Sequence, residues 1–156
     1  MTDAFDLNAL QEPLDLPFPA ATKQVSGDVN GVRTDVMSVR FSDKIMITIS
    51  QKGRLGHWLH VPLENKNPGT EGLHTIPEFA DDGLLPLNNL TATSVLGGRA
   101  PGHEVVGQLY ARQIASAIVT KSPHESRLLV VGLGLETVDA DRDVFFAIVD
   151  LVLQCI

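Results

Sequence analysis

The stretch from Ile45 to Glu64 follows the two-residue period of β-strands on both sides of a turn that contains two glycines. Its first strand places three isoleucines on one face, Ile45, Ile47 and Ile49. The second strand also has one strongly apolar face, formed by Leu59, Val61 and Leu63. The opposite faces are mixed and carry Met46, Thr48, Trp58 and His60. Because such faces are poorly suited to bulk water, we predict a hairpin in a sheet that is covered on both sides.

The chain before this stretch predicts another hairpin, over residues 22–41. Its centre is Asn30-Gly31, a dipeptide that favours a two-residue turn because both residues accept a positive φ. The outgoing strand, Val32–Phe41, has the same period and leads through Ser42-Asp43 into Ile45. Three strands are therefore expected to follow one another closely in this part of the chain.

The chain after Glu64 changes from the period of strands to that of helices. Thr91–Leu96 is a short β-branched strand, and Gly102–Lys121 has apolar residues at a spacing of 3.6. The unbroken apolar run Arg127–Leu135 predicts an interior strand. A final helix begins near three aspartates, which suit a helix N-terminus, and these are Asp139, Asp141 and Asp143.

The order of these elements is βββββαβα, which indicates an α+β fold. We expect a mainly antiparallel sheet of about six strands with two helices on one face. Two helices can cover only one face of such a sheet, so the other face is predicted to be covered by a dimer partner. The candidate dimer interface consists of Met46, Thr48, Trp58 and His60.

A chain of 156 residues indicates one domain, which we place at residues 20–156. Residues 1–19 contain four acidic side chains and three prolines, and they predict a flexible acidic arm. Residues 65–90 interrupt the strand pattern with prolines, glycines and further acids, and they predict a long loop insert.

The acidic charge of the chain is concentrated in these two appendages. The formal net charge is −7, and residues 1–19 and residues 64–91 contribute −4 each. The rest of the chain is close to neutral, which argues against nucleic acid as a partner.

The expected location is the cytoplasm, with the nucleus as an alternative. Asp3 and Asp6 stand where a secretory signal would carry Lys or Arg, and the lone Cys155 cannot form an internal disulfide. No apolar run is long enough to cross a membrane, so no membrane partner is expected.

Two glycine-rich segments could be interpreted as cofactor-binding motifs, but another interpretation is favoured for each. Val131–Leu135 begins like a dinucleotide-binding fingerprint, but its glycines fall inside the predicted strand, where close backbone packing explains them better. Gly97–Gly102 precedes a helix and could cradle an anion, but it lacks the Lys-Ser/Thr of a phosphate loop, so a plain loop is favoured. No cofactor is assigned.

The residues that could bind a metal or act as a nucleophile do not form a recognised pattern either. The aspartates near 141 start like a calcium loop, but Val144 and Asp150 occupy the positions of its Gly and Glu, so a helix cap is favoured. His57 and His60 project to opposite faces of their strand and cannot share a metal. There is no G-x-S-x-G motif, and Cys155 is expected to be a packed thiol. We assign no catalytic or metal-binding residue and expect no enzyme.

The segment Ile45–Gly56, IMITISQKGRLG, resembles the proteasome assembly chaperone 3 family. In that family a hydrophobic strand ends in Gln, a Gly-basic-hydrophobic-Gly turn follows, and the next strand closes on Leu-Glu, here Leu63-Glu64. The similarity resumes at Thr93–Gly97 and continues through the two helices and the strand between them. The turn is its most specific part.

The resemblance implies a small subunit that pairs with a related chaperone, or with itself, and binds α-ring subunits during assembly of the 20S proteasome core. The connecting turn is basic and projects from the sheet, which makes it the candidate α-subunit contact; its residues are Lys52, Gly53, Arg54, Leu55 and Gly56. The arm and the insert depart from compact members of the family, and the end Gln154-Cys155-Ile156 lacks the hydrophobic-Tyr-x tail by which other assembly chaperones dock.

Two other functions stay open on the sequence. A roadblock- or longin-like dimeric scaffold for trafficking or GTPase complexes has a similar mix of strands and helices, but it would require a helix between the second and third strands. A small hydrolase would require Ser, His and Asp residues from distant positions to converge in space.

Overall fold

The structure, a computed structural model, describes residues 20–64, 89–138 and 141–156. The predicted arm 1–19 and most of the predicted insert 65–90 lie outside the described residues. The strands are β1 (Ala21–Val29), β2 (Val32–Arg40), β3 (Lys44–Gln51), β4 (His57–Pro62), β5 (Thr93–Leu96) and β6 (Leu128–Gly134). The helices are α1 (His103–Lys121) and α2 (Arg142–Leu153). None of the helices in the described part of the chain is long and apolar enough to span a membrane.

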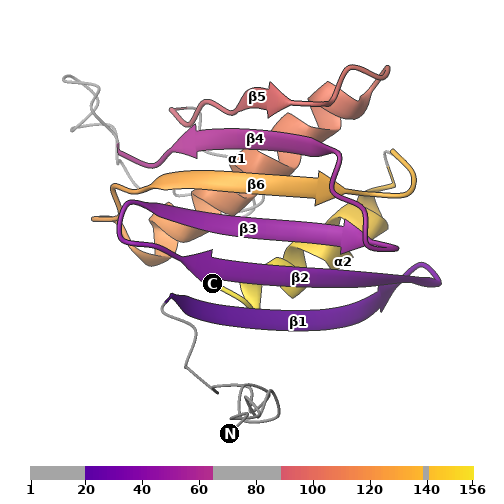
Figure 1. The fold of residues 1–156 in the computed structure, drawn as a ribbon, viewed down its shortest axis with the longest axis horizontal. Coiled ribbons are helices and arrows are strands. Elements are labelled where there is room, and N and C mark those ends of the chain that lie inside the picture. Colours follow the sequence, from indigo (N-terminus) through magenta and orange to yellow (C-terminus); the bar gives the residue numbers. More distant parts are fainter. Residues whose placement is uncertain (1–19, 65–88, 139–140) are drawn as a thin grey trace, which may run out of the picture.

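The six strands form one sheet in the order β1-β2-β3-β6-β4-β5. Four of the five neighbouring pairs are antiparallel, and β3 and β6 are parallel. Figure 1 shows both helices behind the sheet, with α1 behind β4, β5 and β6 and α2 behind β1 and β2. The α+β fold, the order βββββαβα and the placement of both helices on one face are therefore confirmed.

The pairing of the two strands in Ile45–Glu64 differs from the prediction. β3 and β4 do not form a hairpin, because β6 lies between them and pairs with both. Alternation determines which side chains share a face but not which strand lies alongside. β6 is apolar on both faces, and a central position is the one that buries both of them. The turn Lys52–Gly56 is consequently a connection that passes across the end of β6.

Glycine at position 134 makes this crossing possible. The amide of Gly56 donates to the carbonyl oxygen of Leu133 at 3.0 Å, which ties the connection to β6. A Cβ atom on Gly134 would fall on the carbonyl oxygen of Arg54, so no other residue fits without a shift of the backbone.

The start of β6 is fixed beside β3 by a second set of contacts. The Arg127 guanidinium donates to both carboxylate oxygens of Glu125 and to the carbonyl oxygen of Phe41 at 2.9 Å. The amide of Leu128 donates to the carbonyl oxygen of Asp43. The hydrogen bonds from Arg127 lower the pKa of Glu125 to about 2, so the pair is charged at neutral pH.

The core lies between the sheet and the two helices. Its centre is made by fully buried side chains from four strands and both helices, among them Ile47, Val36, Leu59, Val131, Ile114 and Ile148. Each fully buried aliphatic side chain of this kind contributes about 1.5–3 kcal/mol relative to an exposed one. α2 approaches β1 so closely that Leu151 occupies the space that a side chain at Gly27 would need. The predicted apolar stripe of α1 points into this core, although Val105 and Leu109 at its margin are exposed.

We expect Gly134→Ala to destabilise the protein by about 1–3 kcal/mol, because the new methyl group collides with the crossing connection. The matched control is Gly56→Ala, where a Cβ atom meets nothing within 4 Å and the backbone φ is not positive. Urea unfolding monitored by Trp58 fluorescence measures both variants. Equal stability of the two variants would show that the connection does not cross β6 as described.

Candidate protein-interaction surfaces

The face of the sheet opposite the helices carries two adjacent apolar rows that run across four strands. The strand registers align Val39, Met46, Val130 and His60 in one row. They align Met37, Thr48, Gly132 and Trp58 in the other. We call the surface formed by these eight residues the open face, because none of the described helices or strands packs against it (Figure 1).

Trp58 dominates the centre of the open face. Its indole ring lies against Gly132 of the neighbouring strand, and it fills the space that a side chain at that position would take. The ring stays partly exposed, whereas Thr48 in the same row is 6% exposed. An aromatic ring packed against a sheet offers a large apolar area at low cost in conformational entropy, and such residues are common at the centres of interfaces.

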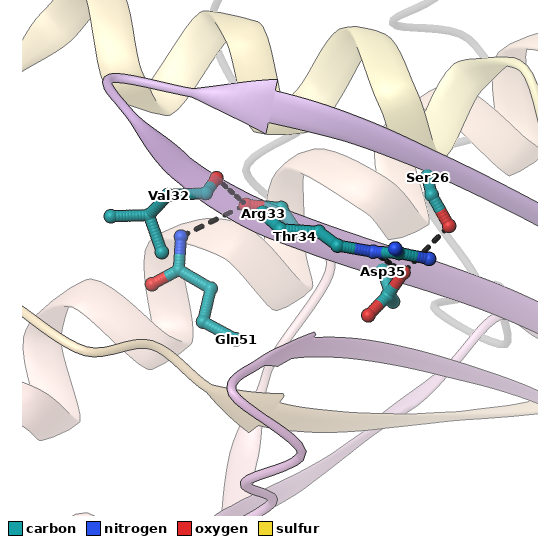
Figure 2. A network of polar contacts seen from close by, with 6 residues as sticks. All are labelled: Ser26, Val32, Arg33, Thr34, Asp35 and Gln51. Atoms are coloured by element: carbon teal, nitrogen blue, oxygen red, sulfur yellow. Dashed lines mark hydrogen bonds and ion pairs between the residues drawn. The ribbon is translucent and has the colours of Figure 1, made fainter.

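A polar group borders the apolar rows at the β1–β2 end of the sheet, and Figure 2 shows it. The Ser26 hydroxyl donates to Asp35 Oδ1 at 2.6 Å, and Arg33 Nε donates to the same oxygen at 3.2 Å. These two hydrogen bonds, that from Ser26 first, lower the pKa of Asp35. An apolar centre with a hydrogen-bonded, charged border is the usual organisation of a protein–protein interface.

The four residues predicted for the dimer interface all lie on the open face, within its two rows. That a partner covers them stays a prediction. Sequence reasoning missed Val130 and did not include Met37 or Val39, although the alternation of Val32–Phe41 places Met37 and Val39 on one face. Val130 could not be assigned to this face until its neighbouring strands were known.

The predicted α-subunit contact, Lys52–Gly56, begins with a tight turn. Lys52 and Gly53 have φ values of 54° and 69°, and the amide of Arg54 donates to the carbonyl oxygen of Gln51 at 3.2 Å. Lys52 forms an ion pair with Glu136, whereas Arg54 is exposed and Leu55 is 41% exposed. The connection therefore presents one cationic and one apolar side chain to solvent on a fixed backbone.

The residue that holds this turn in place is the buried Gln51. Its Nε2 donates to Thr34 Oγ1 at 2.9 Å, and its Oε1 accepts from the amide of Glu136 at 2.8 Å. Thr34 Oγ1 in turn donates to the carbonyl oxygen of Val32, as Figure 2 shows. The side chain thus joins β2, the end of β3 and the segment after β6. From the sequence Gln51 could be recognised only as part of a motif. Its structural role could not be predicted, because its hydrogen-bond partners are distant in the chain.

A pocket of about 230 Å³ lies behind the turn, between the end of β6 and the first turns of α1. Its apolar walls come from Val106, Leu133, Leu135 and Val138, and its polar groups come from Arg54, His57 and His103. The His57 ring is held between Gly98 and Gly107, where neither glycine has room for a Cβ atom. Burial, and secondarily the nearby charge of His103, lower the pKa of His57, while Glu104 acts in the opposite direction.

The pocket does not contain a recognisable catalytic arrangement in the described part of the chain. His57 Nε2 and Ser94 Oγ are hydrogen-bonded at 2.7 Å, but no described carboxylate bonds the other ring nitrogen to orient it. Within residues 20–64, 89–138 and 141–156, no three His, Cys, Asp or Glu side chains are placed to hold a metal ion. As predicted, His57 and His60 project to opposite faces of β4.

The described residues of the other motifs have structural roles. The glycines at 132 and 134 lie inside β6 and serve close packing. Gly97 and Gly98 form a loop with positive φ values that packs on Gly56 and His57. The Asp141 carboxylate caps α2 by accepting from the amide of Asp143. Cys155 is buried, which raises the pKa of its thiol.

Comparison with known proteins identifies a family that matches this chain. The family model of proteasome assembly chaperone 3 matches residues 47–155, which is more than half of the chain. The chain belongs to the proteasome assembly chaperone 3 family. The match includes the Lys52–Gly56 connection and runs through α2. It confirms the resemblance carried by IMITISQKGRLG, and it assigns the protein to a family of chaperones rather than enzymes.

A solved structure shares the fold of this family member. It is a chain from the crystal structure of a chaperone complex for yeast 20S proteasome assembly, with a TM-score of 0.50 and 18% sequence identity. The alignment covers 85% of the present chain and 98% of the yeast chain. At this identity the likeness establishes the fold. No curated protein matches the chain.

We expect the stability of this chaperone-family protein to fall as the pH drops below about 6.5, through His57. Its pKa is lower in the folded protein than in the unfolded chain. Between these two pKa values the unfolded chain binds more protons, so acid favours unfolding. Urea titrations from about pH 7.5 to 5 should give a shallower pH dependence for His57→Gln than for the wild type. The control His124→Gln removes an exposed histidine and should retain the wild-type slope; an unchanged slope in His57→Gln would contradict the prediction.

Proposed function

We propose that this protein is one subunit of a dimeric, non-enzymatic chaperone that binds α-ring subunits while the 20S proteasome core is assembled. It pairs through the open face with a related small chaperone, or with a second copy of itself when isolated. The Lys52–Gly56 connection contacts the α subunit. This role belongs to the cytoplasm or the nucleus.

The observation that carries the pairing is the apolar centre of the sheet, against which no other described element packs. Met37, Met46, Trp58 and Val130 are each half-buried in the free chain, and they are contiguous across β2, β3, β6 and β4. Soluble monomers rarely leave such a continuous apolar surface without a partner. A second sheet of the same family provides a matching surface, because two twisted sheets pack face to face with their side chains interdigitated.

The rigidity of the connection supports its use as a contact. Its first residue is held by the Lys52–Glu136 ion pair, its last by the bond from Gly56 to Leu133, and the strand before it by Gln51. The backbone that carries Arg54 and Leu55 is therefore already ordered before a partner binds. A preorganised loop loses little conformational entropy when it binds, which favours affinity.

The alternatives have less support from the described residues. A roadblock- or longin-like scaffold would have a helix between the second and third strands, whereas Phe41, Ser42 and Asp43 join β2 to β3 without one. A hydrolase would need a third group to orient His57, and the described residues offer none within hydrogen-bond distance.

We expect Trp58→Asp to convert the dimer to a monomer, because it places a charge in the apolar centre of the open face. Sedimentation of the purified chain, and of the chain co-expressed with its sibling chaperone, should show about half the mass of the wild-type assembly. Met46→Lys tests the adjacent row without uncovering Gly132. The matched control, Leu153→Asp, alters an exposed apolar residue of α2 on the other side of the sheet. An unchanged mass in both open-face variants would reject the interface.

We expect the double substitution Lys52→Ala and Arg54→Ala to weaken binding to a proteasome α subunit by about tenfold, mainly through the association rate. The control Arg33→Ala removes another exposed cation from the same end of the sheet, one that is paired with Asp35. Biolayer interferometry on immobilised α subunits measures the rates. Affinity purification with mass spectrometry identifies the bound subunit. If the double variant binds at the wild-type rate, the Lys52–Gly56 connection is not part of the α-subunit contact.

A further inference from the structure

The exposed apolar side chains of the described residues are concentrated at one end of the molecule. Seven large apolar side chains among the described residues are at least 36% exposed, and two of them, Phe41 and Leu153, lie apart from the others. The remaining five come from the connection before β4, from β5 and from α1; they are Leu55, Val95, Leu96, Val105 and Leu109. Val105 is 71% exposed and Leu96 is 66% exposed, values that are unfavourable in water unless a partner covers them. Leu96 is the register partner of Trp58 and therefore continues the open face onto β5. We call the other four residues and the pocket beside them the β5–α1 surface.

Several of the exposed residues are close in sequence to residues that line the pocket. Leu55 stands between Arg54 and Gly56, which both line the pocket. Gly98 and Val106 also line the pocket. Leu96, at the end of β5, is two residues before Gly98, and Val105 immediately precedes Val106. In Figure 1 the ends of β3, β5 and β6 and the start of α1 all lie toward the right-hand side of the sheet. The pocket and the exposed residues therefore belong to the same segments at this end of the sheet.

The walls of the pocket are preformed. The His57 ring is fixed by its hydrogen bond to Ser94 and by close contact with Gly98 and Gly107. The bond from Gly56 to Leu133 fixes the adjacent wall. A concave apolar site with a few fixed polar groups binds a side chain without first having to reorganise.

This surface carries positively charged side chains, whereas the chain as a whole is negatively charged. The whole chain carries −7, yet the pocket is lined by Arg54 and His103, and exposed Arg99 lies in the adjoining loop. Glu104 is the adjacent carboxylate, and Gln108 donates to it. Lys52 is already neutralised by Glu136, whereas Arg54 has no ion-pair partner among the described residues. A carboxylate from a partner would complement Arg54.

β5 also offers an unused backbone edge. It is the last strand of the sheet, and its outer edge pairs with no other strand of the described residues. Such an edge accepts an extended segment through main-chain hydrogen bonds, while pockets for its side chains determine specificity.

We propose that the β5–α1 surface is the site at which a proteasome α subunit inserts an extended segment, with an apolar side chain in the pocket and an acidic side chain against Arg54. This inference rests on the proposed function and adds to it the chemistry of the segment that is recognised. The Lys52–Gly56 connection contributes Arg54 and Leu55 to this surface and is one wall of it.

The experiment uses the full chain with its sibling chaperone and tests each purified proteasome α subunit in turn by biolayer interferometry. Val105→Glu places a charge on the β5–α1 surface, and Val138→Trp enlarges a side chain that lines the pocket. Both should weaken binding by at least about tenfold. The control is Leu153→Glu, which changes an exposed apolar residue on α2 and should bind like the wild type. Thermal unfolding confirms that each variant is folded.

A charge exchange tests the acidic contact separately. Arg54→Glu should lose affinity, and the loss should be partly restored by an α-subunit variant in which the contacting Asp or Glu is replaced by Lys. The wild-type chain failing to bind any α subunit would overturn the proposed function together with this inference. Wild-type binding that persists in Val105→Glu and Val138→Trp would overturn the inference alone. A fall in the sedimenting mass of Val105→Glu would also overturn it, because the surface would then be a contact between chaperone chains.

Discussion

The pairing of β6 with both β3 and β4 is the constraint on which the rest of the structure depends. β6 is parallel to β3 and antiparallel to β4, so it separates two strands that are adjacent in the sequence. This insertion buries an apolar run on both faces, as a central strand allows. It also requires the Lys52–Gly56 connection to cross the end of β6, where only glycine at position 134 leaves room.

Both candidate interaction surfaces follow from that insertion. On one side of the sheet, Gly132 of β6 lets the Trp58 ring pack against the sheet and join Met46 and Val130 in a continuous apolar area. At the end of the sheet, the crossing connection forms a wall of the pocket whose other walls come from β6 and α1. The pocket lies on the helix side of the sheet and the open face on the other side, so the two contacts proposed above would not compete for one surface.

Sequence reasoning succeeded wherever a local pattern carries the information. The periods of two and 3.6 located the strands and helices, Asn30-Gly31 marked a real turn with two positive φ values, and Asp141 caps its helix. The motif around Gln51 was sufficient to recognise the family. The prediction of a hairpin between β3 and β4 was wrong because strands that are adjacent in the sequence only tend to pair. β6 is apolar on both faces and is buried on both when it lies between them. The hydrogen bonds of Gln51 and the pocket around His57 escaped detection because their parts come from distant segments.

The sequence by itself determined which residues form each element and which side chains share a face, since these depend on steric and solvation preferences that act over a few residues. It therefore placed Met46 and Thr48 on one face of their strand, and Trp58 and His60 on one face of theirs, before the strand order was known. Only the tertiary structure decided the order of the strands and the positions of Val130, Arg54 and Val105 relative to one another. These depend on which arrangement of all six strands and two helices buries the most apolar surface, and that comparison involves the whole chain at once.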